Sequence, residues 1–267
     1  MSFKGKACWI TGGSSGVGAA LARELSDKGA SVIISGRNRD RLTEVAADCG
    51  DALVLPFDLR DPDSLKDAAH AAWDWKGGID LAVANAGVSQ RSRALETDMS
   101  VFNEVIGVDL LAQIAFAQAL IGPMVERGSG SLAFVNSLSG KIGVPLRTAY
   151  CAAKFGLAGY ADSLRGELSQ TGVGVHSVFF GSIQTDIARN ALSGDGSIRG
   201  TSDAEIENGL LPQAAARGML DAIAAGEREI IVAAPGMQLE LCNARRTPDA
   251  IFDKVAETVA AGYMESV

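Results

Sequence analysis

The sequence predicts an α/β protein: a doubly wound parallel sheet of about seven strands in a single domain. Short apolar, β-branched segments recur at regular intervals, and segments with helical periodicity separate them. A glycine-rich turn follows the first apolar segment. Strict alternation of strands and helices is typical of parallel sheets with helices on both faces. Because no internal repeat or linker interrupts the 267 residues, we expect one domain spanning residues 1–267.

Seven apolar runs have the length and composition of buried strands. They are Ala7–Thr11, Ser31–Ser35, Ala52–Pro56, Ile79–Ala84, Ser131–Asn136, Val173–Phe179 and Glu229–Val232. The helix-period segments between them span residues 17–28, 39–48, 63–75, 98–126, 148–170 and 212–225. Ligands of such sheets bind at the carboxyl ends of the strands. Functional residues are therefore expected directly after each run.

Composition favours a small-molecule partner. The net charge is -8, which disfavours binding to nucleic acid. The four cysteines have neither the spacing of a metal site nor the density of a disulfide scaffold, so we expect reduced thiols in a cytoplasmic protein. They are Cys8, Cys49, Cys151 and Cys242. We expect no metal site, because neither histidine has an acidic partner at metal spacing.

We expect neither a signal peptide nor a membrane span. The first apolar strand begins at residue 7, which leaves no room for a signal peptide, and there is no uninterrupted run of 18 or more apolar residues.

The turn after the first strand reads Thr11-Gly-Gly-Ser-Ser-Gly-Val-Gly18. Glycines at a strand-to-helix turn allow phosphate to approach the backbone N–H groups at the helix start. No Gly-Lys-Ser/Thr follows, so the turn is not a P-loop. Such a turn can be turn chemistry alone, but its position between the first strand and first helix favours a dinucleotide site. The candidates are Gly12, Ser14, Ser15, Gly16, Val17 and Gly18.

The second strand ends in Ser35-Gly36-Arg37-Asn38. A site that prefers NAD usually places a carboxylate here to hold the ribose 2′-hydroxyl, whereas an arginine can pair with a 2′-phosphate. Gly36 carries no carboxylate and Arg37 follows it. The sequence therefore favours NADP(H) and leaves NAD(H) possible; the alternative is an exposed arginine at the end of a strand.

Tyr150-Cys-Ala-Ala-Lys154 places a phenol and an ammonium four residues apart, on one face of the expected helix. A free tyrosine has a pKa of about 10, and a nearby cation favours the phenolate. Lys154 could thus activate Tyr150 as an acid or base. A surface helix with one tyrosine and one lysine would have the same spacing, so the pair gains its meaning from the motifs around it.

Together these motifs resemble the short-chain dehydrogenase/reductase family, in the form with Thr-Gly-x-x-x-Gly-x-Gly and Tyr-x-x-x-Lys. The resemblance extends from Lys6 to about Ala233. The stretch from Gly140 to Tyr150, with Asp162-Ser-Leu-Arg-Gly-Glu167, is similar to the subgroup of the member 7 type and the 11β-hydroxysteroid enzymes. The resemblance implies a Rossmann fold and hydride transfer between a nicotinamide cofactor and a carbonyl or alcohol. It also implies a homodimer or homotetramer, formed through the helices that begin near residues 98 and 148.

The resemblance implies roles for further residues. Tyr150 would exchange a proton with the substrate oxygen, Ser137 would orient that oxygen, and Lys154 would bind the nicotinamide ribose. Asp58 and Leu59 would lie at adenine, Asn85 beside the cofactor ribose, and Ile183 and Thr185 at the nicotinamide amide. Taken singly, Ser137 and Asn85 could simply end strands, and Asp58 could be a turn former.

One departure from the family concerns catalysis. Many members carry Asn in the middle of the long helix that follows the fourth strand, where it helps to hold a water in a proton relay; here the residue is Asp109. A carboxylate near Lys154 would favour the charged lysine but weaken its effect on the Tyr150 phenol. We therefore count Asp109 among the catalytic candidates and expect an altered rate or pH profile.

Residues 184–212 are the expected substrate-loop region. The loop is long, follows a cofactor-contacting segment and mixes apolar residues with Gly194, Gly196 and Gly200. That composition suits a mobile lid over an apolar ketone or alcohol, although an ordinary surface loop is the alternative.

The motifs leave two function classes: an NADP(H)-dependent oxidoreductase, or a catalytically impaired NADP(H)-binding regulatory protein of the same fold. Retention of Ser137, Tyr150 and Lys154 favours the enzyme.

Overall fold

A seven-stranded parallel sheet forms the centre of the molecule, in the order β3-β2-β1-β4-β5-β6-β7. The computed structural model describes residues 2–234, 236, 253–254, 256–257 and 259–262. The strands are β1 (Ala7–Thr11), β2 (Ser31–Gly36), β3 (Ala52–Pro56), β4 (Leu81–Ala84), β5 (Gly130–Ser137), β6 (Val173–Phe180) and β7 (Glu229–Val232). The order reverses between β1 and β4, which is where doubly wound sheets bind their ligands.

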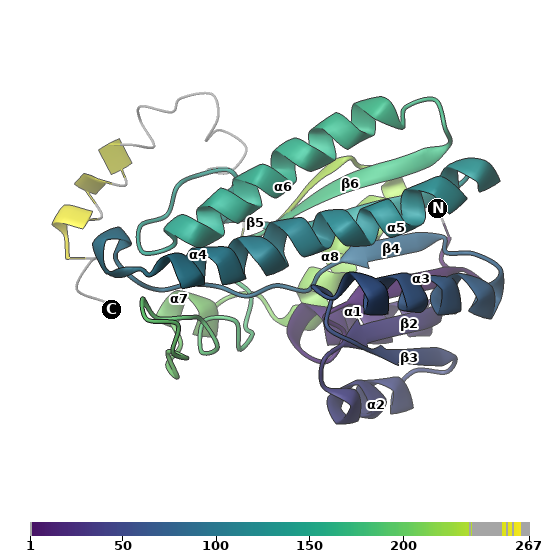
Figure 1. Ribbon diagram of the computed structural model, residues 1–267, viewed down its shortest axis with the longest axis horizontal. Coiled ribbons are helices and arrows are strands. Elements are labelled where there is room, and N and C mark those ends of the chain that lie inside the picture. The colour runs from purple at the N-terminus through teal and green to yellow at the C-terminus, as the bar shows by residue number, and fades with distance from the viewer. Residues whose placement is uncertain (1, 235, 237–252, 255, 258, 263–267) are drawn as a thin grey trace.

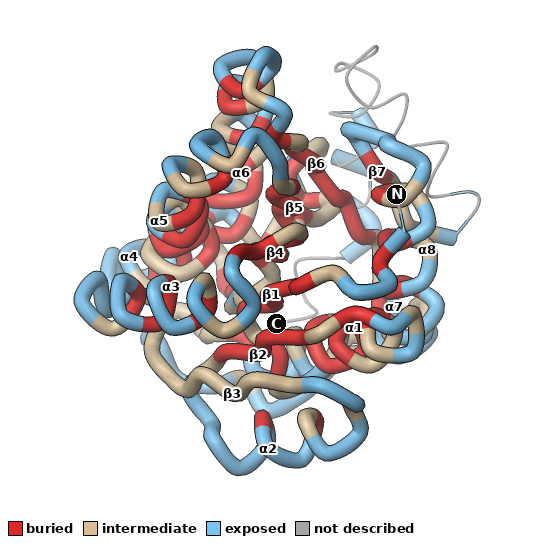
Figure 2. The backbone as a smooth tube through the Cα atoms, turned by 90° about the vertical axis from the view of Figure 1, so that its right-hand side faces the viewer, coloured by how far each residue is buried: buried red, intermediate tan, exposed pale blue. Residues whose placement is uncertain are grey.

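Helices cover both faces of the sheet (Figures 1 and 2). One face carries α1 (Gly16–Asp27), α2 (Arg39–Ala47) and α8 (Pro212–Ala225), whose apolar residues share a core with the sheet. The other carries α3 (Pro62–Lys76), α5 (Ala112–Arg127) and α6 (Thr148–Glu167), which form a second core. The strands β1, β2 and β4 are almost entirely buried, as expected when both faces of a parallel sheet are covered.

The remaining elements are short or lie at the strand ends. They are η1 (Ala94–Glu96), α4 (Met99–Ile106), η2 (Gly107–Leu111), η3 (Leu138–Gly140) and α7 (Ala204–Glu207). In Figure 1, α7 and the loops around it lie below α4, at the end of the molecule opposite to the N-terminus.

The predicted strands and helices are confirmed, with differences of at most three residues at their ends. The expectation of one regular helix over 98–126 is wrong in its middle, because η2 is a π-helical turn between α4 and α5. Asp109 lies in this turn and points inward: its Oδ1 accepts a hydrogen bond of 2.7 Å from the Val88 backbone N–H. Insertions of this kind within α-helices are frequent at functional sites.

The helical stretch Met99–Arg127 bears on the expectation that the chain has no membrane span. By length and composition it would be able to cross a bilayer, with a mean hydropathy of 1.8 over an 18-residue window that is 39% buried. The sequence contains no uninterrupted apolar run of that length, but mean hydropathy tolerates the few polar residues here. A core helix has the same composition, and α5 packs against the sheet beside α3 and α6.

Candidate active site

The glycine-rich turn joins β1 to α1 at the carboxyl edge of the sheet. Gly18 is buried, and a Cβ at this position would collide with the carbonyl oxygen of Gly12 and lie 2.6 Å from Asn85 Nδ2. Only glycine therefore allows α1 to begin so close to the preceding strand. The first turn of α1 has neither a side-chain cap nor an acidic residue, and Ser15 is its N-cap. These features fit the binding of a phosphate group at the helix N-terminus.

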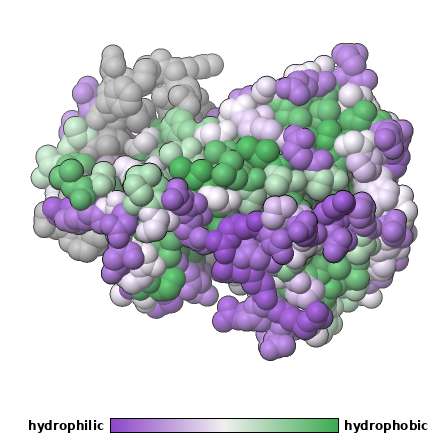
Figure 3. Space-filling model, viewed as in Figure 1, coloured by the Kyte–Doolittle hydropathy of each residue, from purple (hydrophilic) through white to green (hydrophobic). Residues whose placement is uncertain are grey.

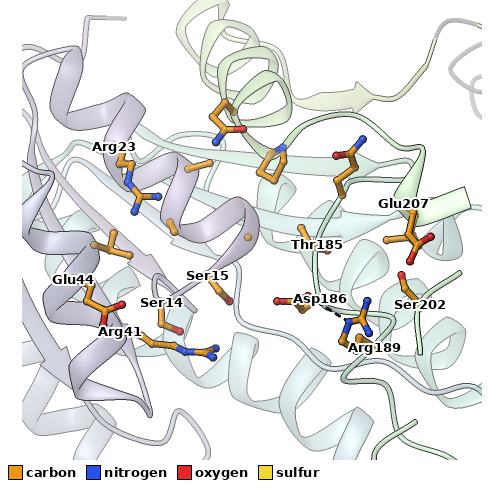
Figure 4. A pocket seen from close by; sticks show the side chains of 18 residues that line it. Ser14, Ser15, Arg23, Arg41, Glu44, Thr185, Asp186, Arg189, Ser202 and Glu207 are labelled. Atoms are coloured by element: carbon orange, nitrogen blue, oxygen red, sulfur yellow. Dashed lines mark ion pairs between the residues drawn. The ribbon is translucent and has the colours of Figure 1, made fainter. Parts of the chain in front are cut away.

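A cavity of about 640 Å³ lies beside this turn (Figure 4). Ser14, Ser15 and Gly16 line one side, and Thr185, from the segment after β6, lines the other. A Cβ on Gly16 would lie 3.0 Å from Thr185 Cγ2. The fold thus brings together two groups of predicted cofactor residues that are far apart in the sequence. Neither Ser137, Tyr150 nor Lys154 lines the cavity, so it is separate from the predicted reacting centre.

Arg37 and Asp58 follow neighbouring strands, β2 and β3. Arg37 is exposed and makes no ion pair with the other described residues. Asp58 is held by Arg60, whose Nη2 lies 2.8 Å from Asp58 Oδ2. Hydrogen bonds from Arg60, with the charges of Arg60 and Arg37, lower the pKa of Asp58 to about 2, although partial burial opposes this. A Cβ on Gly36 would lie 3.8 Å from Ser14 Oγ, so Gly36, the residue before Arg37, borders the glycine turn.

Asn85 follows β4, and its side chain braces the glycine turn. Its Nδ2 donates to the carbonyl oxygens of Thr11 at 2.9 Å and of Gly12 at 3.3 Å. Its backbone N–H donates to Thr11 Oγ1 at 2.9 Å. Asn85 therefore lies at the switch point between β1 and β4, where it fixes the shape of the turn.

The remaining predicted cofactor residues lie on the same edge of the sheet. Val17 is in the first turn of α1, and Leu59 follows Asp58 and packs on the edge of the second core. Ile183 is buried and pairs with Leu210 in an isolated bridge that directs the chain towards Thr185.

Ser137 ends β5, and Tyr150 and Lys154 lie near the start of α6, which is bonded to that end of the strand. Lys154 Nζ donates to the Val135 carbonyl at 3.1 Å, and Asn136 Nδ2 donates to the Lys154 carbonyl at 2.9 Å. These two bonds tie α6 to the carboxyl end of β5, and Ser137 is the last residue of that strand. The Ser137 hydroxyl oxygen accepts the Ser139 backbone N–H at 3.2 Å. Lys154 Nζ lies 5.5 Å from the centre of the Tyr150 ring.

Lys154 is also paired with Asp109. The Nζ to Oδ2 distance is 3.2 Å, and the lysine and aspartate side chains are 5% and 0% exposed. Burial raises the pKa of the Asp109 carboxyl, although the charge of Lys154 and the Val88 N–H oppose this. For Lys154, burial works against the charged form, but Asp109 outweighs it and the pKa is raised. The charged form of Lys154 is therefore favoured, although the side chain is buried.

The sequence alone did not indicate two buried glutamines of this site. Gln113 Nε2 donates to the Ala86 carbonyl at 2.6 Å and to the Val108 carbonyl at 3.0 Å, which links η2 to the loop after β4. Gln90 Oε1 accepts from the Ala149 N–H at 3.1 Å, directly before Tyr150. Both side chains are fully buried. For Gln113 the available signal was its position in an apolar segment, whereas Gln90 lies in a polar segment that offered none.

A comparison with known protein families matches most of this chain. The family model described as short chain dehydrogenase matches residues 6–195. The chain is 33% identical over 245 residues to the dehydrogenase/reductase SDR family member 7B of Danio rerio, covering 88% of this chain and 79% of that protein.

Two solved structures have the same fold. A short-chain dehydrogenase/reductase from Burkholderia phymatum in complex with NAD has a TM-score of 0.83 at 19% identity, over 94% of this chain and 96% of that one. A short-chain dehydrogenase from Burkholderia cenocepacia J2315 in complex with NADP has a TM-score of 0.80 at 22% identity, over 96% and 99%.

Proposed function

The chain belongs to the short-chain dehydrogenase/reductase family, resembling its member 7 type, and we propose that it is an NADP(H)-dependent oxidoreductase that interconverts a ketone or aldehyde and an alcohol. The observation that carries the proposal is the placement of Ser137 at the end of β5 and of Tyr150 and buried Lys154 on the adjoining helix α6, at the sheet edge that also holds the glycine turn. Proton transfer and cofactor binding can therefore occur side by side.

The chain's own residues would bind the cofactor through the glycine turn and Arg37. When bound, NADP(H) supplies or accepts the hydride. The uncapped N-terminus of α1 would hold the pyrophosphate, and Thr185 faces it across the cavity. Arg37 has no carboxylate partner among the described residues and is free to pair with a 2′-phosphate. NAD(H) is the alternative cofactor, since solved relatives of this fold contain either one.

Tyr150 would move the proton. In carbonyl reduction its hydroxyl gives a proton to the substrate oxygen, and in alcohol oxidation it takes one. Ser137 would donate a hydrogen bond to that same oxygen and fix its position. Lys154, held as an ammonium by Asp109, would stabilise the phenolate that Tyr150 becomes when it gives up its proton.

The test compares two tyrosines of one helix. NADPH absorbance is followed with aliphatic, aromatic and steroid ketones. Y150F is expected to abolish turnover while NADPH binding persists, because only the transferable proton is lost. Y160F is the control: Tyr160 lies in α6, and its hydroxyl accepts a hydrogen bond from Gln118. Turnover by Y150F at the wild-type rate would refute the assignment. NADPH binding without turnover of any ketone by the wild type would favour the regulatory alternative.

We also propose that two or more copies associate through α4, α5 and α6. Figure 3 shows hydrophobic residues gathered over the face that these helices present. Met99, the first residue of α4, and Leu111, the last residue of η2, are 68% and 59% exposed. Exposed apolar patches of this kind commonly mark protein interfaces.

We also propose a cytoplasmic location. Cys8, Cys49 and Cys151 are free thiols, and Cys242 lies outside the described residues.

A further inference from the structure

The substrate-loop region, residues 184–212, is fastened to the loop that follows β4. Leu192 N–H donates to the Ser89 carbonyl at 2.8 Å, and Arg91 N–H donates to the Leu192 carbonyl at 2.9 Å. Further along, Asp98 N–H donates to the Gly194 carbonyl at 2.8 Å. A Cβ on Gly194 would collide with the Glu96 carbonyl oxygen. Gly194 thus allows close packing here, which differs from the mobility expected from its glycine content.

A second attachment is electrostatic, and it centres on Asp203 in the same region. Arg91 donates to Asp203 Oδ2 from Nε at 2.9 Å and from Nη2 at 2.8 Å. Arg147 Nη2 lies 3.5 Å from that oxygen, and Arg199 Nη1 donates to Oδ1. One carboxylate therefore receives three guanidinium groups, from the loop after β4, the start of α6 and the region itself.

The cluster is largely shielded from water. The side chains of Arg91, Arg147 and Asp203 are 5%, 13% and 20% exposed. Burial disfavours the charged carboxylate, but the arginines outweigh it and lower the pKa of Asp203 below its ordinary value. Shielded pairs of this kind are screened less by salt than surface pairs, and loss of one partner leaves buried charge behind.

Two of the three arginines belong to segments that place Tyr150. Arg147 is the N-cap residue of α6, three positions before Tyr150. Gln90, next to Arg91, accepts the Ala149 N–H and so caps the same helix from outside. Leu146, which accepts the Ser92 N–H at 3.1 Å, has φ of 66°, an uncommon conformation that surrounding contacts must maintain.

We propose that Asp203 is a positioning residue: it latches the substrate-loop region onto Arg91 and Arg147, and thereby couples closure of that region to the alignment of Tyr150. The proposal rests on the proposed function for its kinetic consequence. Its structural part, that Asp203 holds the substrate-loop region closed, rests only on the contacts of Asp203 with the arginines.

The test measures kinetics and exposure of the region in the full chain. D203N retains the size of the side chain but removes its charge. We expect KM for a ketone to rise about tenfold or more, with a smaller change in kcat and an unchanged Kd for NADPH. Amide hydrogen exchange of residues 189–200 should be faster, and trypsin should cut sooner after Arg189. D195N is the matched control, because Asp195 is an exposed carboxylate of the same region that bonds only with Ser197 among the described residues.

A second variant distinguishes the latch from general stabilisation. R147M should raise exchange of residues 189–200 as D203N does, and the double variant should be little worse than either single one, because both remove the same contact. Additive effects of the two substitutions, or unchanged exchange in D203N and R147M, would overturn the latch. A loss of Tm and of NADPH binding in both single variants would also overturn the latch. If the wild type reduces no ketone, the proposed function fails, while the exchange measurements still decide on the latch.

Discussion

Asp109 Oδ2 lies 3.2 Å from Lys154 Nζ, within a pair that is almost completely buried. The second Asp109 oxygen accepts the Val88 N–H, so the carboxylate joins the π-helical turn η2, the loop after β4 and the helix of Tyr150. A negative charge therefore stands beside the cation that is expected to assist Tyr150, where many family members carry a neutral asparagine.

Replacement of Asp109 by asparagine should change the pH dependence of the reaction. D109N retains an oxygen for the Val88 N–H but removes the charge that offsets Lys154. Because the Lys154 charge is then no longer offset, the pH of half-maximal kcat for alcohol oxidation should fall by about one unit. E104Q, a substitution of a partly exposed glutamate of α4, is the control. A shift to higher pH would mean that Lys154 has lost its proton; an unchanged profile would contradict the influence of Asp109.

Arg37 is expected to set the cofactor preference. R37D replaces the cation after β2 with a carboxylate, which repels a 2′-phosphate and can hold a ribose 2′-hydroxyl. The ratio of kcat/KM for NADPH over NADH should fall by at least about tenfold, as expected for loss of a charged hydrogen bond. R39D, a charge change two residues further on at the start of α2, should leave the ratio close to that of the wild type. An equal effect of both variants would mean that general charge, and not Arg37, determines preference.

Gly18 is expected to tolerate no side chain. In G18A the new methyl group would collide with the Gly12 carbonyl oxygen, and either α1 or the turn would have to move. We expect a loss of about 1–3 kcal/mol in the free energy of unfolding, typical of overpacking, together with weaker NADPH binding. Thermal unfolding and NADPH titration measure the two effects. G50A is the control, since the nearest atom to its methyl group would be Ser26 Oγ at 3.9 Å. Wild-type affinity and stability in G18A would contradict the close approach seen here.

Association through α4, α5 and α6 predicts that a charge at Leu111 disrupts the assembly. Leu111 is 59% exposed at the end of η2, and L111E would place a carboxylate within the proposed interface. Light scattering after size exclusion should show a smaller species than the wild type. L211E, at a similarly exposed leucine (57%) next to α8, should leave the mass unchanged. A wild-type mass for L111E, or a monomeric wild type, would refute this interface.

Local pattern was sufficient to predict most of the fold. Apolar runs and helical periodicity depend on residues near one another in the chain, and the strands β1, β3 and β7 have the predicted limits. The glycine turn was equally predictable, because its glycines lie close together in the sequence, between the first strand and the first helix. The π-helical turn at Asp109 was not, and the groups that Asp109 contacts there, Lys154 and the Val88 N–H, are distant in sequence.

The same difference, between neighbours in the chain and neighbours in space, applies to the residues of the site. The sequence by itself determined the doubly wound α/β fold and the residue types of the proposed active centre, Ser137, Tyr150 and Lys154, because motifs with fixed spacing carry both. Only the tertiary structure decided which groups surround them. It placed Asp109 against Lys154, Gln90 at the start of the Tyr150 helix, and Asp203 against Arg91, a residue 112 positions away. Charge pairing and burial act through space, so those contacts exist only once the sheet has brought the carboxyl ends of its strands together.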